Sequence, residues 1–275
     1  MRIGYKREFM ELLPWLIGVY VFLCAAAYFG NRVFMYHTDP TRVAPAEAGL
    51  EGVSEVELKT PGGETLVAWY SKAKPGRPTV LYFHGNAANA ANRADKFDTM
   101  RSHGAGVFYM NNRGYGGSTG KPTEADNVAD AGTAYAYLRG QGIDAKDIVL
   151  YGESLGSGQA TQLAAKEAVG AVILEAPLTS TVDVGRRTYF FLPLGLLLTD
   201  TFANIDHVKK VKAPLLVLHG EQDGVIPVQM GKDVYAAANE PKKLELLPDA
   251  THNDMFEHGA WEKAWAFIES VRKQR

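Results

Sequence analysis

The sequence predicts an α/β fold in which a mostly parallel sheet of about eight strands is covered by helices on both faces. Six short apolar runs, each of the length of a buried strand, are separated mostly by helix-forming segments. Strands joined through helices pair in parallel and are buried on both faces. With 275 residues, 46% of them hydrophobic, the chain is long enough for one such domain. The apolar runs occupy residues 79–85, 106–112, 147–154, 171–177, 214–220 and 243–248.

A hairpin and an insertion complete the expected architecture. Two alternating segments, 53–60 and 65–72, are joined by Pro-Gly-Gly-Glu, which is typical of a hairpin turn. Residues 178–212 are too long for an ordinary crossover and predict a small cap insertion. The helices are expected at residues 88–101, 123–139, 155–168, 228–238 and 258–273.

An apolar segment near the amino terminus predicts a membrane anchor. The nineteen residues from Leu12 to Gly30 carry no charge, and as a helix they would span roughly 28 Å, close to the ~30 Å hydrocarbon core of a bilayer. We therefore expect a single-pass transmembrane anchor at 1–36, a linker at 37–52 and a catalytic domain at 53–275. Two alternatives stay open. The segment could be a cleaved signal peptide, because small residues follow Cys24, or a helix of a soluble core.

Basic residues flank this segment unequally and predict its orientation. Arg2, Lys6 and Arg7 precede it, whereas Arg32 and Arg42 follow it. Because positive residues are retained on the cytoplasmic side, the imbalance weakly favours a cytoplasmic amino terminus. The catalytic domain is then expected on the periplasmic or extracellular side.

Charge and motif content exclude several function classes. The net charge of −2 gives no basic field for nucleic acid. The one cysteine, Cys24, lies in the apolar segment, so the rest of the chain has no disulfide, thiolate metal site or cysteine nucleophile. No His-Glu-x-x-His spacing is present, and no Gly-x-Gly-x-x-Gly follows the first strand of a βαβ unit. We expect no metal and no cofactor.

Ser154 is the candidate nucleophile. It lies in Gly-Glu-Ser-Leu-Gly, between the apolar run 147–154 and the helix-forming segment 155–168. A nucleophile elbow requires that strand, that helix and small flanking residues, because the turn is tight. The motif alone would also suit a glycine-rich bend, so the flanking elements carry the assignment.

A base and an acid follow Ser154 in the expected order. His252 follows the last strand, and Asp223 follows the strand before it, with Gly224 and Pro227 nearby to fix the turn. Serine needs a base to remove its proton, and the base needs an acid to orient it. The order Ser, Asp, His is the one expected for this type of sheet. A solvated loop histidine and a helix-capping aspartate are the alternatives, and Asp249 is a competing acid.

The oxyanion donors are expected to be the backbone N–H groups of Asn86 and Leu155. Leu155 follows the nucleophile, and Asn86 lies in the loop after the run 79–85, although this loop could also be a plain turn. His84 is expected to be a packed structural residue. The glycine-rich loop 111–120 is expected to line the cleft, with Arg113 in a structural role.

These motifs, in this order, resemble the α/β-hydrolase superfamily from about Val53 onward. The similarity is greatest to the membrane-anchored hydrolases called alpha/beta-hydrolase domain-containing proteins, and it rests on FHGNAAN, NNRGYGGSTGKPTE, YGESLGSG, EAPLTS, RRTYFFLPLGLLLTDTF, IDHVKKVKAPLLVLHGEQDGVIP and DATHND. The resemblance implies the α/β-hydrolase fold, Ser154 as nucleophile, Asp223 as acid, His252 as base, and Asn86 and Leu155 as oxyanion donors. Asn112 departs from the pattern, because relatives often have an aromatic residue there. Relatives include depalmitoylating thioesterases and poorly characterised esterases.

The function expected from these features is that of a serine hydrolase. It would cleave carboxylic esters or thioesters of a small molecule or lipid through an acyl-enzyme on Ser154. An acyltransferase or an amide or peptide hydrolase could use the same triad, and a non-catalytic membrane scaffold could retain the fold.

The cap contains an uncharged stretch, 189–198, that is too short to span a bilayer. It is expected to be either a buried core helix or an apolar lid that also touches the membrane. In the second case the basic residues near it would face the lipid head groups. These are Arg186, Arg187, Lys209, Lys210 and Lys212.

Overall fold

The computed structural model describes residues 3–87 and 89–274 and contains one eight-stranded sheet. The strands lie in the order β1-β2-β4-β3-β5-β6-β7-β8. β1 pairs with β2, and β2 with β4, in antiparallel fashion, and the other pairs are parallel. The predicted α/β-hydrolase architecture is confirmed. The strands are β1 (Ser54–Lys59), β2 (Thr65–Ser71), β3 (Thr79–Phe83), β4 (Gly106–Met110), β5 (Ile148–Glu153), β6 (Ala171–Glu175), β7 (Leu215–Gly220) and β8 (Lys242–Leu247).

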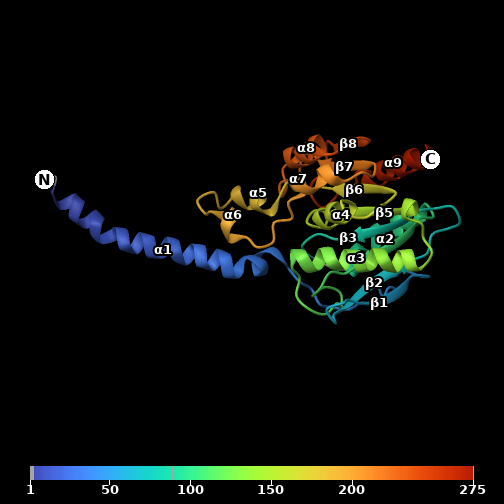
Figure 1. The fold of residues 1–275 in the computed structure, drawn as a ribbon, viewed down its shortest axis with the longest axis horizontal. Helices are drawn as coiled ribbons and strands as arrows, with labels where there is room; N and C mark the ends of the chain where they lie inside the picture. Colours follow the sequence, from blue (N-terminus) through green and yellow to red (C-terminus); the bar gives the residue numbers. More distant parts are fainter. Residues whose placement is uncertain (1–2, 88, 275) are drawn as a thin grey trace.

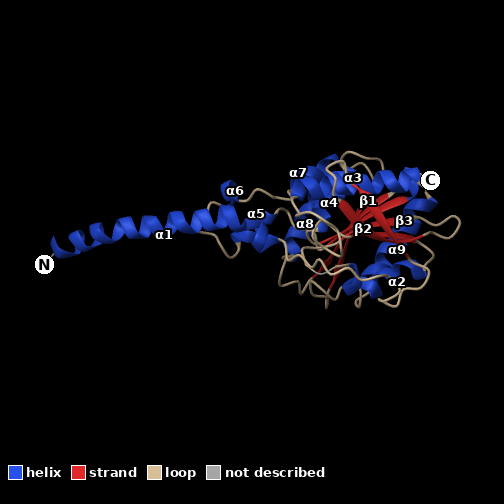
Figure 2. Ribbon diagram, turned by 90° about the horizontal axis from the view of Figure 1, so that it is seen from below, coloured by secondary structure: helices blue, strands red, loops and turns tan. Residues whose placement is uncertain are grey.

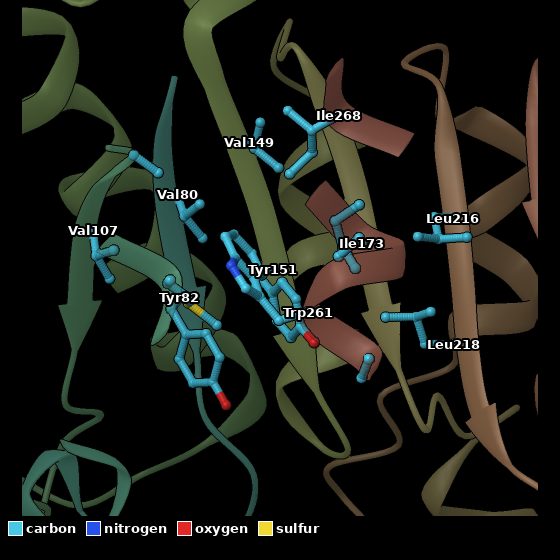
Figure 3. Close-up of a cluster of buried hydrophobic side chains, with 14 of the residues drawn as sticks. Val80, Tyr82, Val107, Val149, Tyr151, Ile173, Leu216, Leu218, Trp261 and Ile268 are labelled. Carbon is cyan, nitrogen blue, oxygen red and sulfur yellow. The ribbon is translucent and has the colours of Figure 1, made fainter. Parts of the chain in front are cut away.

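Helices cover both faces of the sheet (Figure 2). α2 (Ala94–Ser102) and α9 (Ala260–Lys273) pack on one face, and α3 (Glu124–Gly140), α4 (Gly156–Ala164) and α8 (Val228–Ala237) pack on the other. Figure 3 shows the first of these interfaces, where Trp261 of α9 lies against Tyr151 of β5. Every residue of β3 to β7 is buried, which explains why these strands are continuous apolar runs. Three single turns of 3-10 helix are η1 (Ala90–Arg93), η2 (Ala145–Asp147) and η3 (Val208–Lys210).

The amino-terminal helix α1 (Ile3–Met35) is long and projects from the domain (Figure 1). Its apolar part, Leu12–Met35, has 24 residues and a mean hydropathy of 2.0, so by length and composition it could cross a bilayer. Pro14 lies near the start of this part. Of the basic residues expected to orient the anchor, Arg2 lies outside the described residues.

The segment predicted as a linker, 37–52, packs against the domain. His37 forms a parallel bridge with Ala87, and its N–H donates to the carbonyl of Asn86 at 3.0 Å. The carbonyl of Asp39 accepts from the N–H of Gly116, and the side chain of Leu50 is buried in the core. The segment therefore fixes the end of α1 close to the loop that follows β3.

The cap contains three short helices, α5 (Thr181–Arg186), α6 (Leu194–Leu197) and α7 (Asn204–His207). Its apolar stretch 189–198 is not a buried core helix, because Phe190 is 81% exposed and Leu196 is 82% exposed. Both views place α5 and α6 beside the carboxyl-terminal half of α1 (Figures 1 and 2).

The basic residues of the predicted cap insertion lie in two separate regions of the structure. Arg186 and Arg187 lie in or directly after α5 and remain with the cap. By contrast, Lys209 lies close to the start of β8. Its carbonyl accepts a hydrogen bond at 2.7 Å from the side chain of Asn239, which shortly precedes that strand. Residues 209–212 therefore lie near the amino ends of β7 and β8, whereas Arg186 and Arg187 lie at the end of α5.

Candidate active site

Ser154 lies at the sharp turn between β5 and α4, and its φ of 53° places it in the left-handed region. The turn requires its two glycines for close packing. A Cβ at Gly152 would lie 2.6 Å from the carbonyl oxygen of Gly156, and one at Gly156 would lie 2.2 Å from that of Phe83. The N–H of Ser154 donates to the carbonyl of Glu175 on β6 at 2.8 Å. This geometry is that of a nucleophile elbow.

The loops after β5, β7 and β8 bring three predicted side chains together. His252 Nε2 lies 3.1 Å from Ser154 Oγ, and His252 Nδ1 lies 2.7 Å from Asp223 Oδ2. Parallel strands end at the same edge of a sheet, so residues far apart in the chain meet there. The side chain of Asp249, the competing acid, is exposed, and the carboxylate beside His252 is that of Asp223.

Asp223 is held as a carboxylate by four donors. Burial opposes its ionisation, but hydrogen bonds from His219 and His252 outweigh that cost and hold the pKa of Asp223 well below its usual value. The N–H groups of Val225 and Ile226 each donate to Oδ1 at 2.8 Å. His219 was not predicted as a site residue, because it lies within β7 and belongs to no separate motif.

Asn86 and Leu155, the predicted oxyanion donors, lie beside Ser154 along one cavity. The carbonyl of Asn86 accepts from the hydroxyl of Tyr115 at 2.7 Å, and its side-chain amide donates to the carbonyl of Met35 at 3.1 Å. These bonds fix the loop. Within the part of the chain that the structure describes, neither backbone N–H donates to another residue, so both are free to bind an oxyanion.

His84 lies at the end of β3 and forms hydrogen bonds with this loop and with the loop after β4. It is fully buried, and burial lowers its pKa to about 4, so the imidazole is neutral. Nδ1 lies 2.7 Å from the carbonyl of Gly85, and Nε2 accepts from the N–H of Asn112 at 3.0 Å. Its position and bonds agree with the predicted structural role.

The glycine-rich loop 111–120 does not line the cavity, contrary to the prediction. None of its residues, all of which the structure describes, contributes to the cavity wall. Arg113 instead forms a two-point ion pair with Asp130 at 2.8 and 3.0 Å, which is the structural role expected for it. Asn112 pairs with the side chain of Gln159 on α4.

The cavity above Ser154 has a volume of about 700 Å³ and lies between α1, the cap and the carboxyl edge of the sheet. The contribution of α1 was not predicted, because nothing in its sequence indicates which face meets the domain. Apolar residues dominate its wall, and the described residues that line it include no carboxylate. Those residues are Leu23, Ala26, Ala27, Asn31, Phe34, Met35, Asn86, Ala87, Ser154, Leu155, Leu178, Thr181, Val184, Gly185, Tyr189, Phe191, Leu192, Leu194, Leu198, Val225, Ile226, His252 and Asn253.

The family model described as serine aminopeptidase, S33, matches residues 74–204 and 194–259. An uncharacterized protein of Mycobacterium tuberculosis is 35% identical over 227 residues, which cover 82% of this chain and 81% of the relative. Alpha/beta hydrolase domain-containing protein 17B of Homo sapiens is 31% identical over 210 residues, 74% of this chain and 70% of the relative. The chain belongs to the α/β-hydrolases.

Solved structures agree with this α/β-hydrolase fold. The Pyrococcus furiosus esterase Pf2001 superimposes with a TM-score of 0.69 and 19% identity, over 86% of this chain and 97% of the esterase. The acylaminoacyl peptidase of Pyrococcus horikoshii gives a TM-score of 0.63 and 18% identity, over 79% of this chain and 41% of the peptidase. At these identities the likeness concerns the fold alone.

A buried charge cluster lies next to Ser154, the predicted nucleophile. The carboxylate of Glu153, which precedes Ser154, pairs with Arg93 at 2.7 Å and Lys96 at 3.3 Å. Lys96 also pairs with Glu175 at 3.0 Å. Burial opposes ionisation of Glu153, but the two cations hold its pKa well below the usual value. This cluster could not be predicted, because its partners come from separate elements.

We expect the change Glu153→Gln to lower the free energy of unfolding by about 3–5 kcal/mol, because it leaves the buried Arg93 without a countercharge. Denaturant titration in detergent, followed by tryptophan fluorescence, measures this loss. The matched control is Glu57→Gln, which removes an exposed pair with Arg42 and should cost less than about 1 kcal/mol. Equal losses in the two variants would contradict a stabilising role for the cluster.

Proposed function

We propose that this α/β-hydrolase is a membrane-anchored serine hydrolase that cleaves carboxylic esters or thioesters through an acyl-enzyme on Ser154. One observation carries the proposal: His252 lies within hydrogen-bond distance of both Ser154 Oγ and Asp223 Oδ2, at the floor of an apolar cavity. That arrangement supplies a nucleophile, a base and an orienting acid.

The reaction proceeds in two halves. Ser154 Oγ attacks the carbonyl carbon while His252 Nε2 takes its proton, and the N–H groups of Asn86 and Leu155 bind the oxyanion. Collapse of the tetrahedral intermediate breaks the bond to the alcohol or thiol, which receives the proton from His252. Water, deprotonated by His252, then attacks the acyl carbon. The bond from this carbon to Ser154 Oγ breaks as His252 returns the proton to Oγ, and the carboxylic acid is released. Asp223 remains ionised throughout and stabilises the imidazolium.

The apolar wall of the cavity favours a substrate with an apolar acyl group over a peptide with a free amino terminus. The matching family model is described as a serine aminopeptidase, and an aminopeptidase must bind an α-ammonium group. Such a cation needs a carboxylate, and the described residues of the cavity wall offer none. An acyltransferase would use the same first half-reaction with an acceptor other than water.

The membrane anchor is the second part of the proposal. The length and composition of Leu12–Met35 support a single transmembrane span. Arg2, Lys6 and Arg7 precede it, whereas Arg32 and Arg42 follow it, so the larger number of basic residues before the span favours a cytoplasmic amino terminus. The catalytic domain is then proposed to lie on the non-cytoplasmic side.

The test uses the detergent-solubilised full chain. A fluorophosphonate probe should label the protein, and mass spectrometry should place the adduct on Ser154. Hydrolysis of p-nitrophenyl esters with acyl chains of about two to sixteen carbons, compared with an acyl thioester, should then identify the preferred leaving group. An adduct on another residue, or hydrolysis of neither class, would overturn the proposal.

A further inference from the structure

One face of α1 forms a wall of the cavity above Ser154. Leu23, Ala26, Ala27, Asn31 and Phe34 line the cavity. Apart from the adjacent Ala26 and Ala27, they follow one another at intervals of three or four residues, so they share one side of the helix. The cap, between residues 181 and 198, supplies the facing wall. The cavity is therefore closed on one side by the segment that also anchors the protein.

The helix is fixed against the cap by polar contacts. Arg32 donates to both carboxylate oxygens of Asp200 at 3.0 and 3.1 Å, and the hydroxyl of Tyr36 donates to the same side chain at 3.0 Å. Nearer the amino terminus, the hydroxyl of Tyr20 donates to the carbonyl of Phe191 at 3.0 Å. Because Asp200 is almost fully buried, these bonds hold the cavity face of α1 in one rotation.

The same helix also meets the oxyanion loop. The carbonyl of Met35, in the last turn of α1, accepts from the side chain of Asn86 at 3.1 Å. Asn86 is one of the two proposed oxyanion donors, so the cavity wall and the reaction centre are joined by a direct hydrogen bond.

The cavity face of α1 reaches hydrocarbon depth. A helix crosses the hydrocarbon core with about 20 residues, and counted from Leu12 this length extends to Asn31. Ala26 and Ala27 then lie within the leaflet next to the domain. The cap helices α5 and α6 lie beside this half of the helix (Figure 1), and Phe190, in the segment between them, is 81% exposed.

We infer that α1 is part of the substrate-binding site and that its alanines set the accepted acyl-chain length. The substrate is a long-chain acyl ester dissolved in the bilayer, whose chain lies between α1 and the cap while its carbonyl reaches Ser154. The methyl groups of Ala26 and Ala27 leave the space that the chain occupies. The inference rests on the proposed hydrolase function and names its substrate class.

The test compares Ala27→Phe with Ala25→Phe in the full chain reconstituted in phosphatidylcholine vesicles. The two positions lie roughly 160° apart on the helix, and Ala25 does not line the cavity, so the control adds the same ring on the opposite side. The probes are p-nitrophenyl hexadecanoate and p-nitrophenyl butanoate. For Ala27→Phe, the ratio of kcat/KM for the long ester to that for the short ester should fall about tenfold or more. For Ala25→Phe the ratio should equal that of the wild type.

A smaller substitution and a labelling assay distinguish a change in the cavity from misfolding of the variant. Ala27→Leu should lower the ratio by less than Ala27→Phe does, and fluorophosphonate labelling of Ser154 reports whether each variant is folded. An unchanged ratio in labelled Ala27→Phe, or an equal fall in Ala25→Phe, would overturn the inference while leaving the hydrolase function intact. Absence of wild-type hydrolysis and labelling would instead overturn the proposed function itself.

Discussion

The change Ser154→Ala should lower kcat for ester hydrolysis by about 10⁴-fold or more and abolish fluorophosphonate labelling. The loss is large because no acyl-enzyme forms without the hydroxyl, and His252 then has no nucleophile to deprotonate. The residual rate would come from the oxyanion donors and from substrate binding alone. Steady-state kinetics with a p-nitrophenyl ester, together with gel-based labelling, measure both effects.

The fold of this variant should remain intact, which makes the loss interpretable. Ser154 already holds a φ of 53°, and alanine bears the same backbone strain there as serine does. The N–H of residue 154 would still donate to the carbonyl of Glu175. Unfolding transitions that match those of the wild type would verify this. Labelling that survives the change would contradict the assignment of Ser154 as nucleophile.

The change Asp223→Asn should lower kcat by about 10³- to 10⁴-fold and leave KM nearly unchanged. An amide could donate to His252 Nδ1, which would fix the imidazole in the tautomer that cannot accept the proton of Ser154. The amide oxygen could still accept from the N–H groups of Val225 and Ile226, so the loop should keep its shape. Kinetics on a short p-nitrophenyl ester separate the effect on kcat from that on KM.

The matched control for this change is Asp249→Asn. Asp249 lies three residues before His252 and was the competing acid in the sequence, but its side chain is exposed. The change should therefore leave kcat within about twofold of the wild type. If Asp249→Asn abolished activity and Asp223→Asn did not, the acid of the triad would have to be reassigned.

The eight strands could be predicted because each carries its own signal. The buried strands are continuous apolar runs, and the β1–β2 hairpin alternates around Pro61 to Glu64. The cap could not be predicted in the same way. Residues 189–198 are apolar in either a buried helix or an exposed surface, and only the packing of the neighbouring elements shows that Phe190 and Leu196 are exposed.

The candidate site also contains residues that could be predicted from the sequence and residues that could not. The residues Ser154, Asp223 and His252 follow separate strands in the order expected for this sheet, and the structure brings their side chains within hydrogen-bond distance. The buried ion pairs of Glu153, the residue before Ser154, could not be predicted. Glu153 gains its partners from α2 and the turn before it, and these contacts join positions that no local pattern relates.

The α/β alternation, the tight turn at Ser154 and the apolar amino-terminal helix follow from local signals in the chain, because propensity, periodicity and glycine placement act over short stretches. By contrast, the closure of the cavity above Ser154 by α1 is seen only once the chain is folded. The contact that fixes it, between Arg32 and Asp200, joins residues 168 positions apart. Long-range pairing of this kind depends on how whole elements pack, and it leaves no periodic trace in the chain.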